Sequence, residues 1–133
     1  MKTISRICSI ALLVCILLVI SSALAEGITP RADTEFASAY PTLTSSKSVS
    51  FKAITTSPKS SISVTACWLE KKIGTTWSEV CSLTPPSYIA QNGMVYNSSA
   101  SYSSQIGTGT YRVWATFNAD GHEITRCSNE KTF

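Results

Sequence analysis

Residues 109–127, GTYRVWATFNADGHEITRC, decide the fold because they predict a β-hairpin. The first half alternates between apolar side chains and polar or amphipathic ones, which is the period of a half-buried strand. Asp120-Gly121 follows, and both residues tolerate the positive φ angles of a two-residue hairpin turn. The expected core face carries Tyr111, Val113, Ala115 and Phe117, and the outer face carries Arg112, Trp114, Thr116 and Asn118.

The same period of two runs outward from this hairpin, and no stretch has the i, i+3, i+4 spacing of an amphipathic helix. Pro41 places the first strand at a sheet edge, because proline cannot donate to a ladder. Residues 57–60, Ser-Pro-Lys-Ser, are predicted as a turn. The predicted strands are residues 35–43, 48–56, 62–71, 75–83, 93–103, 110–118 and 123–132. Seven short strands separated by turns predict an all-β domain, built as one antiparallel β-sandwich.

The N-terminal segment, residues 1–25, is predicted to be a secretory signal-peptide helix. Lys2 and Arg6 precede an uncharged apolar run over residues 7–20, and the segment ends in Ala-Leu-Ala at Ala25. The run is too short for a membrane anchor, which needs about 20 apolar residues. We therefore expect cleavage after Ala25, a mature β-sandwich domain over residues 26–133, and release into the extracellular medium without a stable membrane anchor. No cell-wall sorting motif is visible.

The charge of the chain argues against a polyanionic partner. The 11 basic residues only slightly outnumber the 8 acidic ones, and two basic residues leave with the signal peptide. A nearly balanced mature chain has no electrostatic basis for binding nucleic acid or an anionic membrane.

A resemblance can be stated on the residues quoted above. Gly109-Thr110-Tyr111-Arg112-Val113 resembles the penultimate strand of immunoglobulin-like and fibronectin-like domains, in which a tyrosine caps a corner of the sandwich. The whole chain resembles small secreted proteins of Gram-positive bacteria whose function is unknown, on its signal peptide, its Ile28–Arg31 start and its final hairpin. The resemblance implies an immunoglobulin-like sandwich and implies no catalytic residues.

Three cysteines remain after signal cleavage, which is an odd number for an exported protein. A turn at residues 71–75 would place Cys67 opposite Cys81, with Trp68 facing Val80 on the core side. We therefore expect a Cys67–Cys81 disulfide; Cys67–Cys127 and a fully reduced chain are the alternatives. Cys127 is then a free thiol, which is either a small half-buried side chain or a functional group, as an intermolecular disulfide partner or a reactive thiol.

No catalytic, cofactor-binding or metal-ligating residue is predicted, so we do not expect an enzyme. His122 is the only histidine, and Cys127 lies on the same strand with the opposite parity, about 16 Å away. One histidine and three scattered cysteines lack the ligand spacing of a zinc site, and no calcium-binding loop is present.

The outer face of the hairpin is the candidate binding surface. Trp114 and Arg112 project from it, and Trp77 could join them from a neighbouring strand. A tryptophan on a sheet face can stack on a sugar ring or anchor a protein. We expect a non-catalytic extracellular module that binds a protein, glycan or cell-wall ligand. A self-assembling structural protein is the alternative, and a small enzyme or membrane-active toxin is less favoured. The sequence leaves the oligomeric state open.

Overall fold

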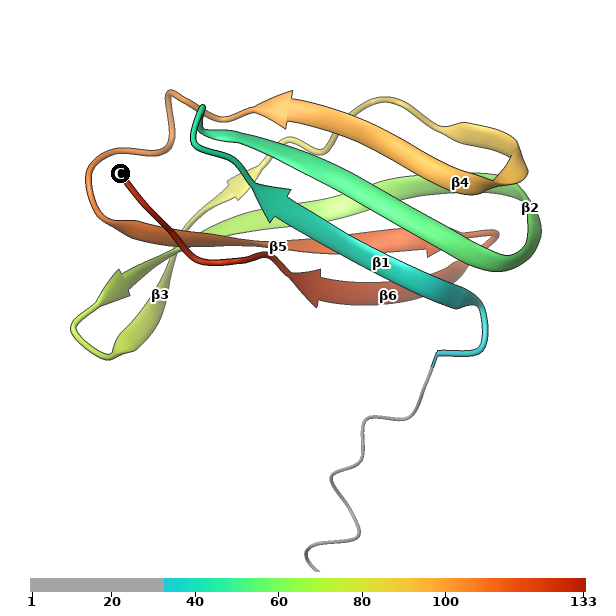
Figure 1. The fold of residues 1–133 in the computed structure, drawn as a ribbon, viewed down its shortest axis with the longest axis horizontal. Coiled ribbons are helices and arrows are strands. Elements are labelled where there is room, and N and C mark those ends of the chain that lie inside the picture. The colour runs from blue at the N-terminus through green and yellow to red at the C-terminus, as the bar shows by residue number, and fades with distance from the viewer. Residues whose placement is uncertain (1–32) are drawn as a thin grey trace, which may run out of the picture. The chain divides into compact units, whose positions relative to one another are not determined.

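The computed structural model describes residues 33–133, which form one antiparallel, seven-stranded β-sheet (Figure 1). No helix in this range is long and apolar enough to cross a membrane. The all-β prediction is confirmed. The predicted signal peptide lies outside the described residues. The strands are β1 (Phe36–Leu43), β2 (Ser48–Ile73), β3 (Thr76–Leu83), β4 (Ala90–Ser101), β5 (Thr110–Ala119), β6 (His122–Cys127) and β7 (Lys131–Thr132).

The long strand β2 organises the sheet. Residues 48–54 pair with β1 along one edge and with β4 along the other. Residues 62–71 pair with β5, and residues 67–73 pair with β3. β6 and β7 add to the far side of β5. Because the sheet is partly curled, β1 also lies against β5 and β6 (Figure 1).

Residues 57–60, predicted as a turn between two strands, are part of the continuous strand β2, so the expected break between strands is absent. The long strand folds back on itself in this region (Figure 1), and its pairing with β4 is interrupted between Ile54 and Lys59. Pro58 falls in this interruption, so its missing N–H leaves no ladder bond unmade. The buried Thr55 hydroxyl donates to the Ser57 carbonyl oxygen at 2.8 Å, which holds the bend.

The turn predicted at Asp120-Gly121 is present between β5 and β6. Asp120 has a φ of 50° and Gly121 a φ of 91°. The Asp120 carboxylate accepts hydrogen bonds from the backbone N–H groups of Ser60 and Ser61, at 2.9 and 2.8 Å. The hydrogen bond from Ser60 is the largest cause that lowers the pKa of Asp120, and the bond from Ser61 is the next. The hairpin turn is thereby tied to the bend in β2.

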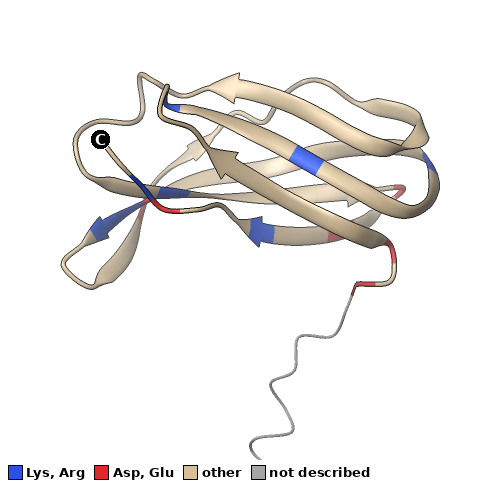
Figure 2. Ribbon diagram, in the orientation of Figure 1, with Lys and Arg blue, Asp and Glu red and all other residues tan. Residues whose placement is uncertain are grey.

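The core lies inside the curl of the sheet. Tyr111, Val113, Ala115 and Phe117 of β5 are all buried, as the alternation predicts. Facing them are buried side chains of the other strands: Leu43, Val49, Phe51, Ala53, Ile62, Leu69 and Tyr96. The strand β4 carries no charged residue (Figure 2).

The prediction that Trp68 faces the core is wrong. A register shift between Val64 and Ala66 inserts Thr65 as an extra residue against β5, which is a β-bulge. After the bulge, the residues of β2 that face the core are the odd-numbered ones and no longer the even-numbered ones. Cys67 and Leu69 are therefore buried, whereas Ala66 is exposed and Trp68 is half-buried on the outer face.

The register predicted between β2 and β3 is also wrong. Cys67 lies opposite Leu83, and Cys81 lies opposite Leu69. Cys67 and Cys81 are therefore diagonal neighbours, a separation of about 7–8 Å that is too long for a disulfide. Cys127 lies opposite Trp114 and so on the other face from Cys67. All three cysteines are free in the structure, Cys127 half-buried among them.

The last predicted strand, residues 123–132, is divided into β6 and β7. Between them the Asn129 side chain accepts from the Leu43 N–H at 2.9 Å and donates to the Leu43 carbonyl at 3.1 Å. At the other end of β1, His122 Nε2 lies 2.9 Å from Asp33 Oδ2. We call this side-chain closure between β1 and the last hairpin the β1–β6 seam. Among the described strands, β1 pairs with β2 alone, as expected for an edge strand containing Pro41.

Candidate functional site

All three tryptophans of the chain lie half-buried on the outer face of β2, β3 and β5. The structure brings together the three residues of the candidate surface. The Arg112 guanidinium carbon lies 4.2 Å from the Trp77 ring centroid and 5.4 Å from that of Trp114. Both distances are typical of cation–π contacts. We call this set, together with Trp68 and Glu70, the tryptophan patch.

Glu70 connects Arg112 and Trp114 within the tryptophan patch. Its Oε2 accepts hydrogen bonds from Arg112 Nε at 2.6 Å and from Trp114 Nε1 at 2.9 Å. The rings of Trp68 and Trp114 stack with centroids 6.0 Å apart and planes 8° from parallel. Trp114 therefore lies between Trp68 and Arg112, and its polar N–H is already satisfied. Trp114 supports the patch and is not an open platform for a ligand.

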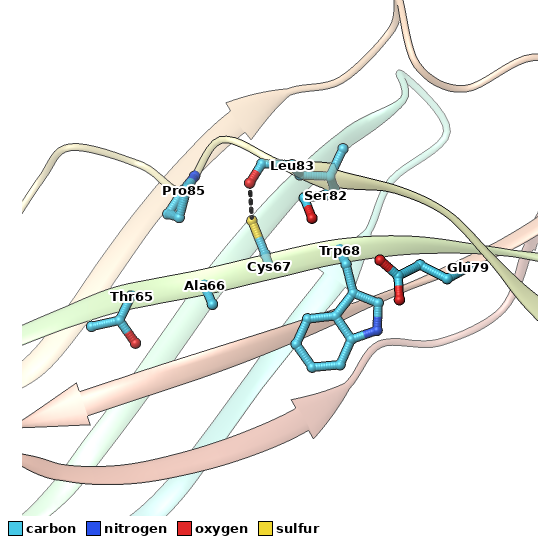
Figure 3. Close-up of a pocket in the computed structure, with 8 residues that line it drawn as sticks. All are labelled: Thr65, Ala66, Cys67, Trp68, Glu79, Ser82, Leu83 and Pro85. Atoms are coloured by element: carbon cyan, nitrogen blue, oxygen red, sulfur yellow. Dashed lines mark hydrogen bonds between the residues drawn. The ribbon is translucent and has the colours of Figure 1, made fainter.

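A pocket of about 440 Å³ opens beside Trp68 (Figure 3). It forms where the pairing along one edge of β2 is interrupted. The pairing of β2 with β4 ends at Ile62, and its pairing with β3 begins at Cys67. No strand therefore covers residues 63–66 of β2 on that edge. The bulge at Thr65 lies within this gap. The lining residues are Thr65, Ala66, Cys67, Trp68, Glu79, Ser82, Leu83 and Pro85.

Two polar groups in the pocket are available to a ligand. Glu79 lies directly opposite Glu70 in the β2–β3 register, and two like charges in that position repel. Arg112 balances the charge of Glu70 through a salt bridge. The Glu79 carboxylate makes no hydrogen bond or salt bridge within residues 33–133. The Ser82 hydroxyl is likewise unbonded within that range. Figure 3 shows Glu79 beside the Trp68 indole. The pocket thus combines an aromatic face with an acceptor and a hydroxyl.

Cys67 and Cys127 are not activated as nucleophiles. Cys67 lies at the wall of the pocket, where its thiol donates to the Leu83 carbonyl at 3.6 Å. Burial raises the pKa of Cys67, and it also raises the pKa of Cys127. A raised pKa lowers the fraction of nucleophilic thiolate. Neither cysteine therefore has the low pKa of a reactive thiol.

His122 is engaged in the β1–β6 seam. Its ring binds Asp33 and lies 6.0 Å from the Phe36 ring, centroid to centroid. It begins β6, whereas Cys127 ends the same strand. The two side chains form no dyad. Within the described part of the chain, no group of three or more His, Cys, Asp or Glu residues is arranged to hold a metal ion.

Sequence reasoning missed Trp68, Glu70 and Glu79 as members of the site. Glu70 could not be placed, because it lies downstream of the bulge at Thr65 and shares the parity of Trp68. Trp68 could not be placed without knowledge of the bulge. No protein-family model, curated protein or solved structure matches this chain.

Proposed function

We propose that the chain is a secreted, non-catalytic binding module with an immunoglobulin-like β-sandwich fold. The corner of the sandwich supports the fold assignment. The Tyr111 hydroxyl donates to the Thr108 carbonyl at 3.4 Å, as a corner tyrosine does in such domains. Gly109, just before it, has a φ of 133°, a conformation that L side chains rarely adopt. The resemblance to small secreted Gram-positive proteins is compatible with this fold and with export.

The ligand we propose is a saccharide unit of an extracellular or cell-wall glycan. The observation that carries this proposal is the Trp68 indole beside the Glu79 carboxylate in the β2–β3 pocket, where Glu79 has no partner among residues 33–133. The apolar face of a sugar ring stacks on an aromatic ring, and its hydroxyl groups donate to a carboxylate. Ser82 adds a second polar contact. The open shape of the pocket suits one or two sugar units of a longer chain.

The test is a titration of the mature chain with chitotetraose and cellotetraose, followed by tryptophan fluorescence. We expect one of them to change the emission of the tryptophan patch. Glu79→Ala removes a charged hydrogen bond of about 1.5–3 kcal/mol, which corresponds to a loss of affinity of roughly tenfold to a hundredfold. Ser82→Ala should weaken binding less.

Val80→Ala is the matched control, because Val80 is exposed on the same strand but does not line the pocket. It should bind like the unmodified chain. Binding that survives Glu79→Ala and Trp68→Phe unchanged would move the site elsewhere. No response to either oligosaccharide, and no co-sedimentation with insoluble peptidoglycan, would reject a glycan ligand. The mass of the exported chain would show whether it begins at Glu26.

A further inference from the structure

The strand β4 has one edge that no other strand covers. It pairs with β2 alone within residues 33–133. The Tyr102 N–H donates to the Lys47 carbonyl at 2.9 Å. This bond shows which residues of β4 direct their backbone groups toward β2. Hydrogen-bonded and non-hydrogen-bonded pairs alternate along such a ladder. The residues that direct their backbone N–H and C=O groups to the free edge are therefore Val95, Asn97, Ser99 and Ser101, and all four are exposed.

The other edges of the sheet are protected against further pairing. β1 carries Pro41 at a position that faces away from β2, and Asn129 occupies the backbone groups of Leu43. β6 carries Glu123 and Arg126 and lies against β1. β3 carries Glu79 and follows an irregular register. Proline, charge, irregularity and cover are the devices that normally stop strand edges from associating.

From Val95 to Ser101, β4 has none of these devices, because its one register interruption lies before Val95. No charged residue occurs anywhere from Val80 to Tyr111, so the whole free edge is neutral (Figure 2). The exposed face that leads up to this edge is mostly apolar and carries one charged residue, Lys52. Tyr40, Ile54 and Val95 are 47, 44 and 61% exposed, and they line a groove of about 230 Å³ on the outer face of β1, β2 and β4. Val95 lies opposite Ile54, at the edge itself.

We propose that two copies of this chain associate through their β4 edges, as an antiparallel pair that joins the two sheets into one. A neutral strand meets its own copy without like-charge repulsion, whereas it offers no charge to attract a charged foreign peptide. A two-fold axis at Asn97 would place Val95 of one copy opposite Ser99 of the other. The interface is isologous, as in most homodimers, and it continues the apolar groove across both copies. It is separate from the β2–β3 pocket.

The test is sedimentation equilibrium of the mature chain over a wide concentration range, with a reductant present so that Cys127 cannot link the copies. We expect a dimer that dissociates on dilution. Asn97→Pro removes an N–H that points away from β2, and the proline ring blocks a partner strand. We expect this variant to raise the dissociation constant at least tenfold while its circular dichroism spectrum is unchanged. Val95→Asp, which places two like charges near the axis, should do the same if the proline variant does not fold.

Ile54→Lys is the matched control, because it adds a charge to the same outer face on β2 and not at the edge. It should retain the dimer. A wild-type chain that is monomeric at every concentration overturns the proposal, including one that binds a synthetic β4 peptide, since the occupant is then not a second copy. A dimer that survives both edge variants, or that Ile54→Lys alone abolishes, also overturns it.

Discussion

Thr65 shows how one residue decides which side chains a sheet presents to solvent. As the extra residue of a bulge, it reverses the alternation of β2. Upstream, Ile62 and Val64 face the core; downstream, Cys67 and Leu69 do so, and Trp68 is displaced to the outer face. The tryptophan patch and the pocket beside it therefore both depend on this single insertion.

Asp33 is a second single residue that affects the fold, because it links the start of β1 to His122. Its Oδ1 accepts from the N–H groups of Glu35 and Phe36, and its Oδ2 binds His122. The hydrogen bond with His122 is the largest cause that lowers the pKa of Asp33, from 3.8 to about 2. A carboxyl group whose pKa is lower in the folded state stabilises the fold above the unfolded pKa, and this stabilisation is lost as the pH falls through the folded pKa.

We expect Asp33→Asn to lower the free energy of unfolding at neutral pH. The difference from the unmodified chain should shrink as the pH falls from about 4 to 2, because both chains then carry a neutral group at this position. Urea unfolding at several pH values measures it. Glu130→Gln, at an exposed carboxylate, is the control and should have little effect. An Asp33→Asn difference that is the same at pH 2 and pH 7 would contradict the assignment.

Among the elements, the two hairpins show where sequence reasoning holds and where it fails. The β5–β6 hairpin is as predicted, because Asp120-Gly121 closes it with the required positive φ angles. The β2–β3 hairpin turns at Gly74, whose φ is 63°. Farther from the turn, the register shifts between Leu69 and Glu70. The turn and the shift together move Cys81 from its predicted place opposite Cys67.

The structure predicts three free thiols in the reduced, folded chain and none in an intramolecular disulfide. Cys67 should be alkylated most slowly, because it is 3% exposed and its pKa is raised by burial. Intact mass after iodoacetamide treatment, with and without urea, measures this. Three rapid modifications in urea and a slow one at Cys67 without urea are expected. A mapped Cys67–Cys81 bond in the unmodified chain would mean that the register in solution differs.

Local signals in the sequence therefore predicted the strand content, the edge position of β1 and the inward face of β5. They did so because each depends on neighbouring residues: period-two alternation, Pro41, and an Asp-Gly turn. The bulge at Thr65 and the continuity of β2 through Pro58 depend on which strands lie alongside, and no local pattern records that. The structure places Arg112 beside both Trp77 and Trp114, while their role as a binding surface stays a prediction. The pocket beside them arises from a gap between β3 and β4.

For the whole molecule, the β1–β6 seam determines how the curled sheet is closed. No backbone ladder joins β1 to β6 within residues 33–133. Side chains do so instead, Asn129 at one end and the Asp33–His122 pair at the other. Asn129 is the more important contact, because its amide satisfies both backbone groups of the buried Leu43.

We expect Asn129→Ala to lower the free energy of unfolding by about 1–3 kcal/mol, because it leaves the Leu43 N–H and C=O without partners. Urea unfolding followed by circular dichroism measures the change. Gln91→Ala, at an exposed position of β4, is the control and should fall within about 0.5 kcal/mol of the unmodified chain. Equal stabilities of the Asn129→Ala and Gln91→Ala variants would show that the seam does not close the sheet.

The length of β2 has a kinetic consequence. β1, β3, β4 and β5 all pair with this one strand, and Lys71 pairs with Tyr111 far along the chain. Sheets built from such distant pairings fold in milliseconds to seconds, since loop closure precedes most of the gain in contacts. Because four of the other six strands pair directly with β2, opening this strand would remove the pairing partner of all four. The amide protons of β2 should then exchange only through global unfolding, which makes this strand the slowest-exchanging element of the molecule.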